Sequence, residues 1–99
     1  MNVIQTFTEK QIRDLHQLYQ REWWSASRTF EDTKSCLEGS QLCIGIVDGN
    51  GKLIGFARVL TDYVFKALIF DVIVAEESRK TGLGDKLMSL IENHPKLQR

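Results

Sequence analysis

A short loop with two glycines and two basic residues is the part of the sequence best suited to binding chemistry. The loop consists of Arg79, Lys80, Thr81, Gly82, Leu83 and Gly84. It joins an apolar run to a segment with helical spacing, and the first amide groups of a helix lie unpaired at the positive end of its dipole. Glycine also lacks the Cβ atom that would keep a bulky anion from the backbone. The loop is therefore predicted to bind an anion, and a diphosphate group fits it best.

Two other phosphate-binding loops do not match this segment. The Gly-x-x-x-x-Gly-Lys-Ser/Thr pattern of Walker A loops is absent from the sequence. The dinucleotide-binding pattern needs a third glycine, which does not follow Gly82 and Gly84 at the required spacing. The strand expected before the loop also belongs to an antiparallel meander, whereas the dinucleotide-binding fold uses a βαβ unit.

Asp71 is the only acidic residue in the apolar run at residues 67–74. A buried carboxylate is costly unless it is hydrogen-bonded or neutralised. One interpretation is a catalytic base with a raised pKa. The other, which we favour, is a structural hydrogen bond. The sequence leaves both open.

Two helix start signals precede the predicted strands. Thr8 and Gln11 have the spacing of a capping box, and apolar residues at helical spacing follow as far as about Glu22. A second start signal at Thr29 predicts a shorter helix that stops at Gly39.

The remaining elements are a short first strand, three longer strands and a last helix. Strands are expected at 2–5, 42–47, 53–60 and 67–74, with turns at 48–51 and 61–63. The last helix should pack its apolar face on the sheet and end near His94; that face consists of Leu83, Leu87, Met88, Leu90 and Ile91. The order β-α-α-β-β-β-α predicts an α+β fold in a single domain, residues 1–99.

Composition and charge exclude several classes of function. Thirteen basic residues balance thirteen acidic ones, so the chain lacks the basic excess typical of proteins that bind nucleic acid or an anionic membrane. Cys36 and Cys43 are seven apart, outside metal-ligand spacing, and no metal site is expected. No signal peptide is visible, and the longest apolar run is too short to span a bilayer. A reducing cytoplasmic location is therefore expected.

The loop and its surroundings resemble the GNAT N-acetyltransferases. Arg79-x-x-Gly82-x-Gly84 looks like the Q/R-x-x-G-x-G/A loop of that family, and residues 71–88 resemble its strand–loop–helix motif without a gap. Residues 53–59 look like the family's third strand, and the two early helices fall in its order. The resemblance covers the whole chain and implies a GNAT-like mixed sheet, with an antiparallel meander before the loop.

The resemblance implies acetyl-CoA as the acyl donor and an amine as the acceptor. The loop from Arg79 to Gly84 would hold the CoA pyrophosphate, and the backbone of Val72, Ile73 and Val74 would hydrogen-bond pantetheine like an added strand. A strand amide would polarise the thioester carbonyl. The primary amine of a small molecule or a protein would then attack acetyl-CoA directly.

The segment between the two early helices often lines the acceptor site in this family. Trp24 and Arg28 are therefore the candidate substrate-binding residues. Trp23 is expected to pack in the core instead, because it continues the apolar face of the first helix.

Two departures from the family pattern affect the catalytic expectation. Some members place a glutamate base where this sequence has Phe70. The family also continues after the third helix with a strand, a helix that often carries a tyrosine acid, and a last strand, which a chain ending at Arg99 is expected to lack. The alternatives are thus a catalytically weak acetyl-CoA-binding module or a self-associating partial domain. Residues 67–74 contain no lysine or proline and no expected bulge, so homodimerisation through this sheet edge is possible.

Overall fold

The computed structural model describes residues 2–61 and 67–95. Its elements follow in the order β1 (Asn2–Ile4), α1 (Glu9–Gln20), α2 (Phe30–Gly39), β2 (Leu42–Val47), β3 (Leu53–Thr61), β4 (Ala67–Val74), the 3-10 turn η1 (Glu76–Ser78) and α3 (Leu83–Glu92). This order confirms the predicted α+β fold and its succession of elements. The first helix ends earlier than expected, and the expected turn at 61–63 lies mostly outside the described residues.

Both early helices begin with reciprocal capping boxes. The Gln11 amide donates to the Thr8 hydroxyl at 3.3 Å, and the Thr8 amide donates to the Gln11 side chain at 2.9 Å. At the start of α2 the same exchange joins Thr29 and Asp32, at 3.0 Å in both directions. Each box satisfies two amide groups that the helix leaves unpaired.

The four described strands form one sheet in the order β1-β2-β3-β4, and every neighbouring pair is antiparallel. The reversal between β2 and β3 is built on Asp48, whose Oδ1 accepts from the amides of Asn50 at 2.8 Å and Lys52 at 3.0 Å. Gly51 takes the left-handed conformation that this turn needs, with φ of 81°. The predicted meander is therefore confirmed.

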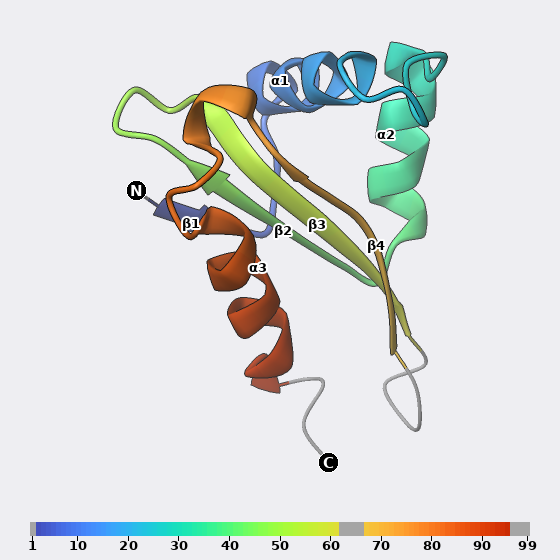
Figure 1. The fold of residues 1–99 in the computed structure, drawn as a ribbon. Helices are drawn as coiled ribbons and strands as arrows, with labels where there is room; N and C mark the ends of the chain where they lie inside the picture. The colour runs from blue at the N-terminus through green and yellow to red at the C-terminus, as the bar shows by residue number, and fades with distance from the viewer. Residues whose placement is uncertain (1, 62–66, 96–99) are drawn as a thin grey trace.

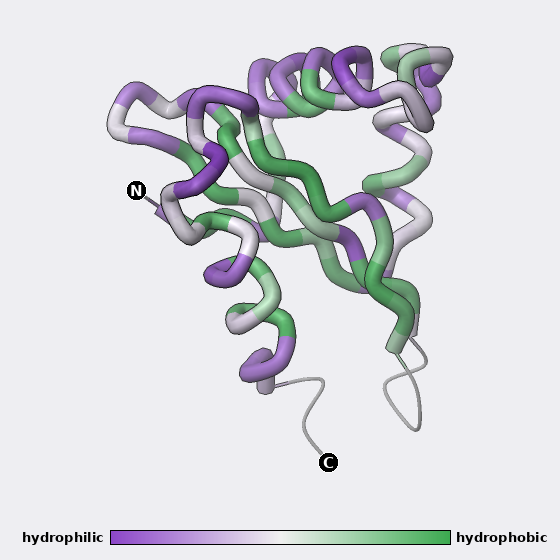
Figure 2. The backbone as a smooth tube through the Cα atoms, viewed as in Figure 1, coloured by the Kyte–Doolittle hydropathy of each residue, from purple (hydrophilic) through white to green (hydrophobic). Residues whose placement is uncertain are grey.

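The helices cover opposite faces of this sheet (Figure 1). Phe56 meets Tyr19 of α1 with ring centroids 6.3 Å apart. A Cβ atom at the preceding residue, Gly55, would lie 3.2 Å from Leu83 of α3. Because neighbouring strand residues point to opposite faces, α1 and α3 lie on opposite sides of β3. The strands between them form the hydrophobic centre of the molecule in Figure 2.

The last helix packs on the sheet much as predicted. Leu83, Leu87 and Ile91 are at most 3% exposed, Leu90 packs partly buried against the core, and Met88 is half-buried. Within residues 2–61 and 67–95, no helix is long and apolar enough to cross a lipid bilayer.

The expectation that β4 has no bulge is wrong. Arg58 faces Phe70 and Phe56 faces Ile73, so Asp71 and Val72 together oppose the single residue Ala57. Asp71 has a φ of 56°, a left-handed value that non-glycine residues adopt infrequently. Such a bulge interrupts an edge and makes it a poorer template for pairing. Homodimerisation through β4 stays a prediction.

The close packing at Gly45 gives a test of the sheet's core. A Cβ atom there would lie 2.8 Å from Leu53 Cδ1 and 2.9 Å from Phe7 Cε2. Gly45→Ala should therefore lower the free energy of unfolding, measured by urea denaturation, by about 1–3 kcal/mol.

Gly39→Ala is the matched control, because no atom lies within 4 Å of a Cβ at this last residue of α2. Replacing a helical glycine by alanine should leave stability unchanged or raise it by up to about 1 kcal/mol. Equal losses in the two variants would contradict the packing argument.

Candidate functional site

The glycine loop connects β4 to α3 through η1. Gly82 is the N-cap of α3 in the left-handed conformation, with φ of 82°, and Lys80 is also left-handed, with φ of 71°. The Lys86 amide donates to the Gly82 carbonyl at 3.0 Å and closes the first helical turn. The amides before Lys86 in the helix therefore have no intrahelical acceptor. The backbone places them at the start of α3, as the sequence predicted.

A hollow of about 330 Å³ lies against this loop. It is lined by Val74, Ser78, Arg79, Lys80, Gly82, Leu83, Gly84 and Asp85. A Cβ atom placed on Gly82 or Gly84 would meet no atom within 4 Å, so open space lies in front of both residues. The loop can accept a bulky anion close to its backbone.

The C-terminal half of β4 presents backbone groups to the outer edge of the described sheet. The Ala75 amide donates to the Ile54 carbonyl at 2.8 Å, so Ala75 faces β3. Backbone groups of successive strand residues alternate in direction. Ile73 therefore faces β3, whereas Val72 and Val74 face outward.

Arg79 links this edge to the segment that follows α1. Its Nε donates to the Val74 carbonyl at 3.2 Å, and its Nη2 lies 2.6 Å from Glu22 Oε1. The guanidinium therefore lies between the Val74 carbonyl and the Glu22 carboxylate. The predicted cofactor-binding residues of β4 and of the loop are brought together.

Asp71 is surrounded by donors from three parts of the chain. Its Oδ2 accepts from Tyr19 Oη at 2.9 Å, from Arg28 Nη1 at 2.8 Å and from Arg58 Nε at 2.5 Å. These residues lie on α1, between α1 and α2, and on β3, respectively. The Asp71 side chain is only 6% exposed, so solvent contributes little to its pairing.

This pairing bears on the two interpretations of Asp71. Burial alone raises the pKa of the Asp71 carboxyl, but the hydrogen bonds from Arg28, Arg58 and Tyr19 outweigh it and hold the pKa below its usual range. A general base works best with a pKa near the operating pH. The contacts therefore favour the structural interpretation of Asp71.

The pairing can also offset the free-energy cost of the left-handed backbone at Asp71. A left-handed conformation costs a non-glycine residue roughly 1–2 kcal/mol. A hydrogen bond to a charged group contributes about 1.5–3 kcal/mol, so the three donors can offset that cost.

The segment between α1 and α2 packs against the same cluster. The Arg28 guanidinium carbon lies 4.5 Å from the Tyr19 ring centroid and 5.5 Å from that of Trp24. Trp24 is 40% exposed, so one part of its ring packs and the rest faces solvent. The expectation of core packing for Trp23 is wrong: α1 ends before it, and Trp23 is 90% exposed.

Sequence reasoning missed Tyr19 and Arg58 as site residues. Tyr19 fits the apolar spacing of the first helix, which conceals that its hydroxyl needs a partner when buried. Arg58 is the one charged residue between 53 and 60, and Asp71 is the one in 67–74. Lone opposite charges in neighbouring antiparallel strands are a signal that could have predicted this pair.

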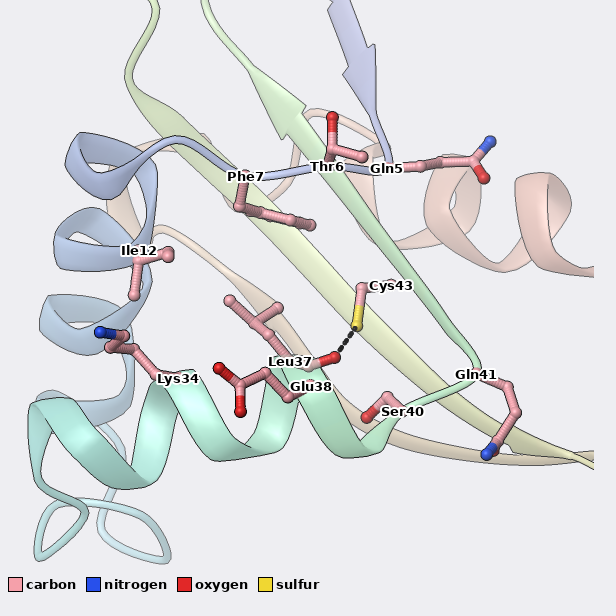
Figure 3. Close-up of a pocket in the computed structure, with 10 residues that line it drawn as sticks. All are labelled: Gln5, Thr6, Phe7, Ile12, Lys34, Leu37, Glu38, Ser40, Gln41 and Cys43. Atoms are coloured by element: carbon pink, nitrogen blue, oxygen red, sulfur yellow. Dashed lines mark hydrogen bonds between the residues drawn. The ribbon is translucent and has the colours of Figure 1, made fainter.

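Two further hollows lie on the α1–α2 side of the sheet. One, of about 530 Å³, is lined by Arg28, Asp32, Ser35, Cys36, Gly39, Arg58 and Leu60. The other, of about 320 Å³, lies between α2, β2 and the segment before α1 (Figure 3). The residues lining the second are Gln5, Thr6, Phe7, Ile12, Lys34, Leu37, Glu38, Ser40, Gln41 and Cys43. It shares no residue with the glycine loop or the Asp71 cluster. In the described part of the chain, no group of histidine, cysteine, aspartate or glutamate could hold a metal ion.

Comparison with known proteins agrees with this geometry. Residues 9–98 match the family described as "Acetyltransferase (GNAT) family". The chain belongs to the GNAT family.

Two curated relatives carry similar names. A protein of Prochlorococcus marinus called "Uncharacterized N-acetyltransferase ycf52-like" is 37% identical over an alignment of 94 residues that covers 87% of this chain and 52% of the relative. "Uncharacterized N-acetyltransferase ycf52" of Pyropia yezoensis is 35% identical over 74% of this chain and 43% of its own length. This GNAT chain therefore spans about half the length of the curated relatives that it matches.

Solved GNAT structures share the fold. A putative GNAT acetyltransferase of Xanthomonas campestris pv. campestris aligns with a TM-score of 0.77 at 30% identity, over 99% of this chain and 70% of that one. An aminoglycoside 6'-N-acetyltransferase complexed with coenzyme A aligns with a TM-score of 0.80 at 18% identity, over 93% of this chain and 53% of that one.

The paired state of Asp71 predicts a pH-dependent stability. Because its pKa is lowered in the folded state, its ionised form stabilises the fold above the unfolded-state pKa of about 3.9. That contribution is lost as the pH falls through the folded-state value. Asp71→Asn should therefore lower the melting temperature at neutral pH, and the difference from wild type should shrink in acid.

Thermal denaturation across the acid range checks this expectation. Glu38→Gln is the control, because Glu38 is exposed, lies outside the first turn of its helix and forms no ion pair with a described residue. A difference between wild type and Asp71→Asn that stays constant at all pH values would mean that the ionised carboxylate is not what stabilises the fold.

Proposed function

We propose that this chain forms the acetyl-CoA-binding part of an N-acetyltransferase that transfers an acetyl group to a primary amine. One observation carries the proposal: the outward-facing backbone of β4 leads directly to the open glycine loop at the start of α3. This continuity suits a ligand with an extended amide-containing arm and a diphosphate. Cys36 and Cys43 of this chain are both free thiols, in keeping with a reducing compartment such as the cytoplasm.

The residues present fit two parts of coenzyme A, the pyrophosphate and the pantetheine arm. The α3 start and the loop from Arg79 to Gly84 would hold the pyrophosphate, with Arg79 and Lys80 adding positive charge. The outward amide and carbonyl of Val74 and the outward carbonyl of Val72 would pair with the pantetheine arm as an added strand. Arg79 would exchange its present contact with the Val74 carbonyl for the phosphate oxygens.

Acetyl-CoA supplies an acetyl thioester whose carbonyl carbon an amine can attack directly. The chain's own part in this chemistry is to orient the thioester and to polarise its carbonyl group. The outward amide of Val72 is the donor best placed for the carbonyl oxygen, because it precedes Val74 on the same edge and lies nearest the Asp71 cluster. A fixed amide of this kind stabilises negative charge that develops on the oxygen.

The acceptor would lie on the α1–α2 side of β4. Trp24 and Arg28 border this region, and the hollow of about 530 Å³ beside Arg28 and Arg58 offers space for a small amine or a protein side chain. Two guanidinium groups share one carboxylate, so the cluster carries a net positive charge. A neighbouring positive charge lowers the pKa of a bound amine and favours the neutral form that attacks.

A second candidate is an acetyl-CoA-binding module with little turnover. It is favoured by the lowered pKa of Asp71 and by Phe70 at the position where some family members have a glutamate. Amine-dependent release of CoA from acetyl-CoA discriminates between the two candidates, because both bind the donor and only the first consumes it.

Gly84→Asp tests the donor site. It places a carboxylate in the first turn of α3 beside the proposed pyrophosphate, where like charges repel. The affinity for CoA, measured by calorimetry, should fall at least tenfold, about 1.4 kcal/mol. The fold should persist, because aspartate in a first helical turn is favourable and replaces a glycine.

The matched control is Gly49→Asp in the β2–β3 turn, where a Cβ atom also meets no neighbour within 4 Å. It adds the same charge away from the loop and should leave CoA affinity unchanged. A folded Gly84→Asp variant with wild-type CoA affinity would rule out this site.

A further inference from the structure

The bulge in β4 determines which amide faces the outer edge. Arg58 faces Phe70 and, one step further, Phe56 faces Ile73. Backbone groups alternate along β3, so Phe56 and Arg58 both face β4. In a ladder continued from Phe70 without a bulge, Phe56 would face Val72, and the Val72 amide would pair with β3. The extra residue moves this pairing to Ile73 and leaves the Val72 amide facing outward.

The bulge is held from outside β4. Its left-handed residue is Asp71, with φ of 56°, and the Asp71 carboxylate accepts from Tyr19, Arg28 and Arg58. Arg28 also reaches the second carboxylate oxygen, at 3.5 Å. The donors come from three different segments, so they fix the carboxylate from several directions rather than from one neighbour.

The three donors are themselves held in place. Tyr19 is fully buried and meets Phe56, which belongs to the ladder next to the bulge. Arg28 stacks on Tyr19 and Trp24, and the Arg58 guanidinium carbon lies 5.4 Å from the Phe70 ring centroid. Because buried and stacked side chains hydrogen-bond the carboxylate, the backbone at Asp71 cannot easily leave its left-handed conformation.

We propose that Tyr19, Arg28 and Arg58 are positioning residues for acyl transfer: by holding Asp71 they maintain the bulge that turns the Val72 amide toward the thioester carbonyl. The inference rests on the proposed function, because it assigns that amide to acetyl-CoA. The inference extends the proposed function, because it names side chains on α1, on β3 and in the segment between the early helices that set the direction of a backbone amide on β4. In this role they act through the Asp71 carboxylate and the backbone of β4, and not by contact with acetyl-CoA.

A comparison of acetyl-CoA with CoA isolates this role. Both ligands have the same pyrophosphate and pantetheine, but only acetyl-CoA has the carbonyl oxygen that the Val72 amide would meet. Wild type should bind acetyl-CoA more tightly than CoA in calorimetric titrations of the 99-residue chain. Tyr19→Phe, which removes one hydroxyl, and Arg58→Gln should reduce this preference threefold or more while changing CoA affinity much less.

A merely structural role would not alter the ratio of the two affinities. It would lower the free energy of unfolding, or reduce the affinities for acetyl-CoA and CoA by the same factor. Arg13→Gln is the control, because Arg13 is exposed on α1 and, among the described residues, forms an ion pair only with Glu9. If Arg58→Gln does not fold, the milder Tyr19→Phe decides. Folded variants that keep the wild-type ratio, or a wild type that binds both ligands equally, would overturn the proposal.

Failure of the proposed function would look different. Neither ligand would then bind wild type, in the same titrations. The anchoring itself is still judged by hydrogen exchange at the amides of Phe70 and Ile73, which pair with β3 on either side of the bulge. Tyr19→Phe and Arg58→Gln should speed that exchange and Arg13→Gln should not; unchanged exchange in all three variants would contradict the anchoring.

Discussion

The Asp71 carboxylate is the one group on which the arrangement of the other parts depends. It is nearly buried in an edge strand, and its charge is compensated by a tyrosine and two arginines from three other segments. Removing a charge from water is expensive unless such partners are present. Asp71 can stay buried only while these partners surround it. The free-energy cost of losing them therefore favours one relative arrangement of α1, the segment before α2, β3 and β4.

This constraint explains why the two sides of β4 look so different. On the side that faces α1 and α2, charged and aromatic side chains determine how β4 packs. Along the outer edge and at the glycine loop, backbone groups determine it, since the outward amides of Val72 and Val74 and the first turn of α3 belong to the main chain. The bulge at Asp71 joins the two, because a side-chain interaction there sets the direction of a backbone amide.

Local signals in the sequence were enough for most of the fold. The capping boxes at Thr8 and Thr29 and the Asp48 turn act over a few residues, and each formed as predicted. The glycine loop was found in the same way, because Gly82 and Gly84 act through their own backbone. The end of α1 was less predictable: apolar spacing continues to Trp23, but the helix stops sooner and Trp23 points to solvent.

The bulge and its anchors could not be predicted from such local patterns. The run 67–74 contains no glycine and has the apolar pattern of an unbroken strand. Aspartate tolerates the left-handed conformation better than most residues, but its type alone does not predict a bulge. The cause lies at Tyr19, Arg28 and Arg58, which are 52, 43 and 13 residues away from Asp71 in sequence. Asp71 adopts a conformation that its own neighbours do not favour because contacts distant in sequence compensate for it. A strand position with poor local preference and a lone charge is therefore where a search for such distant partners should begin.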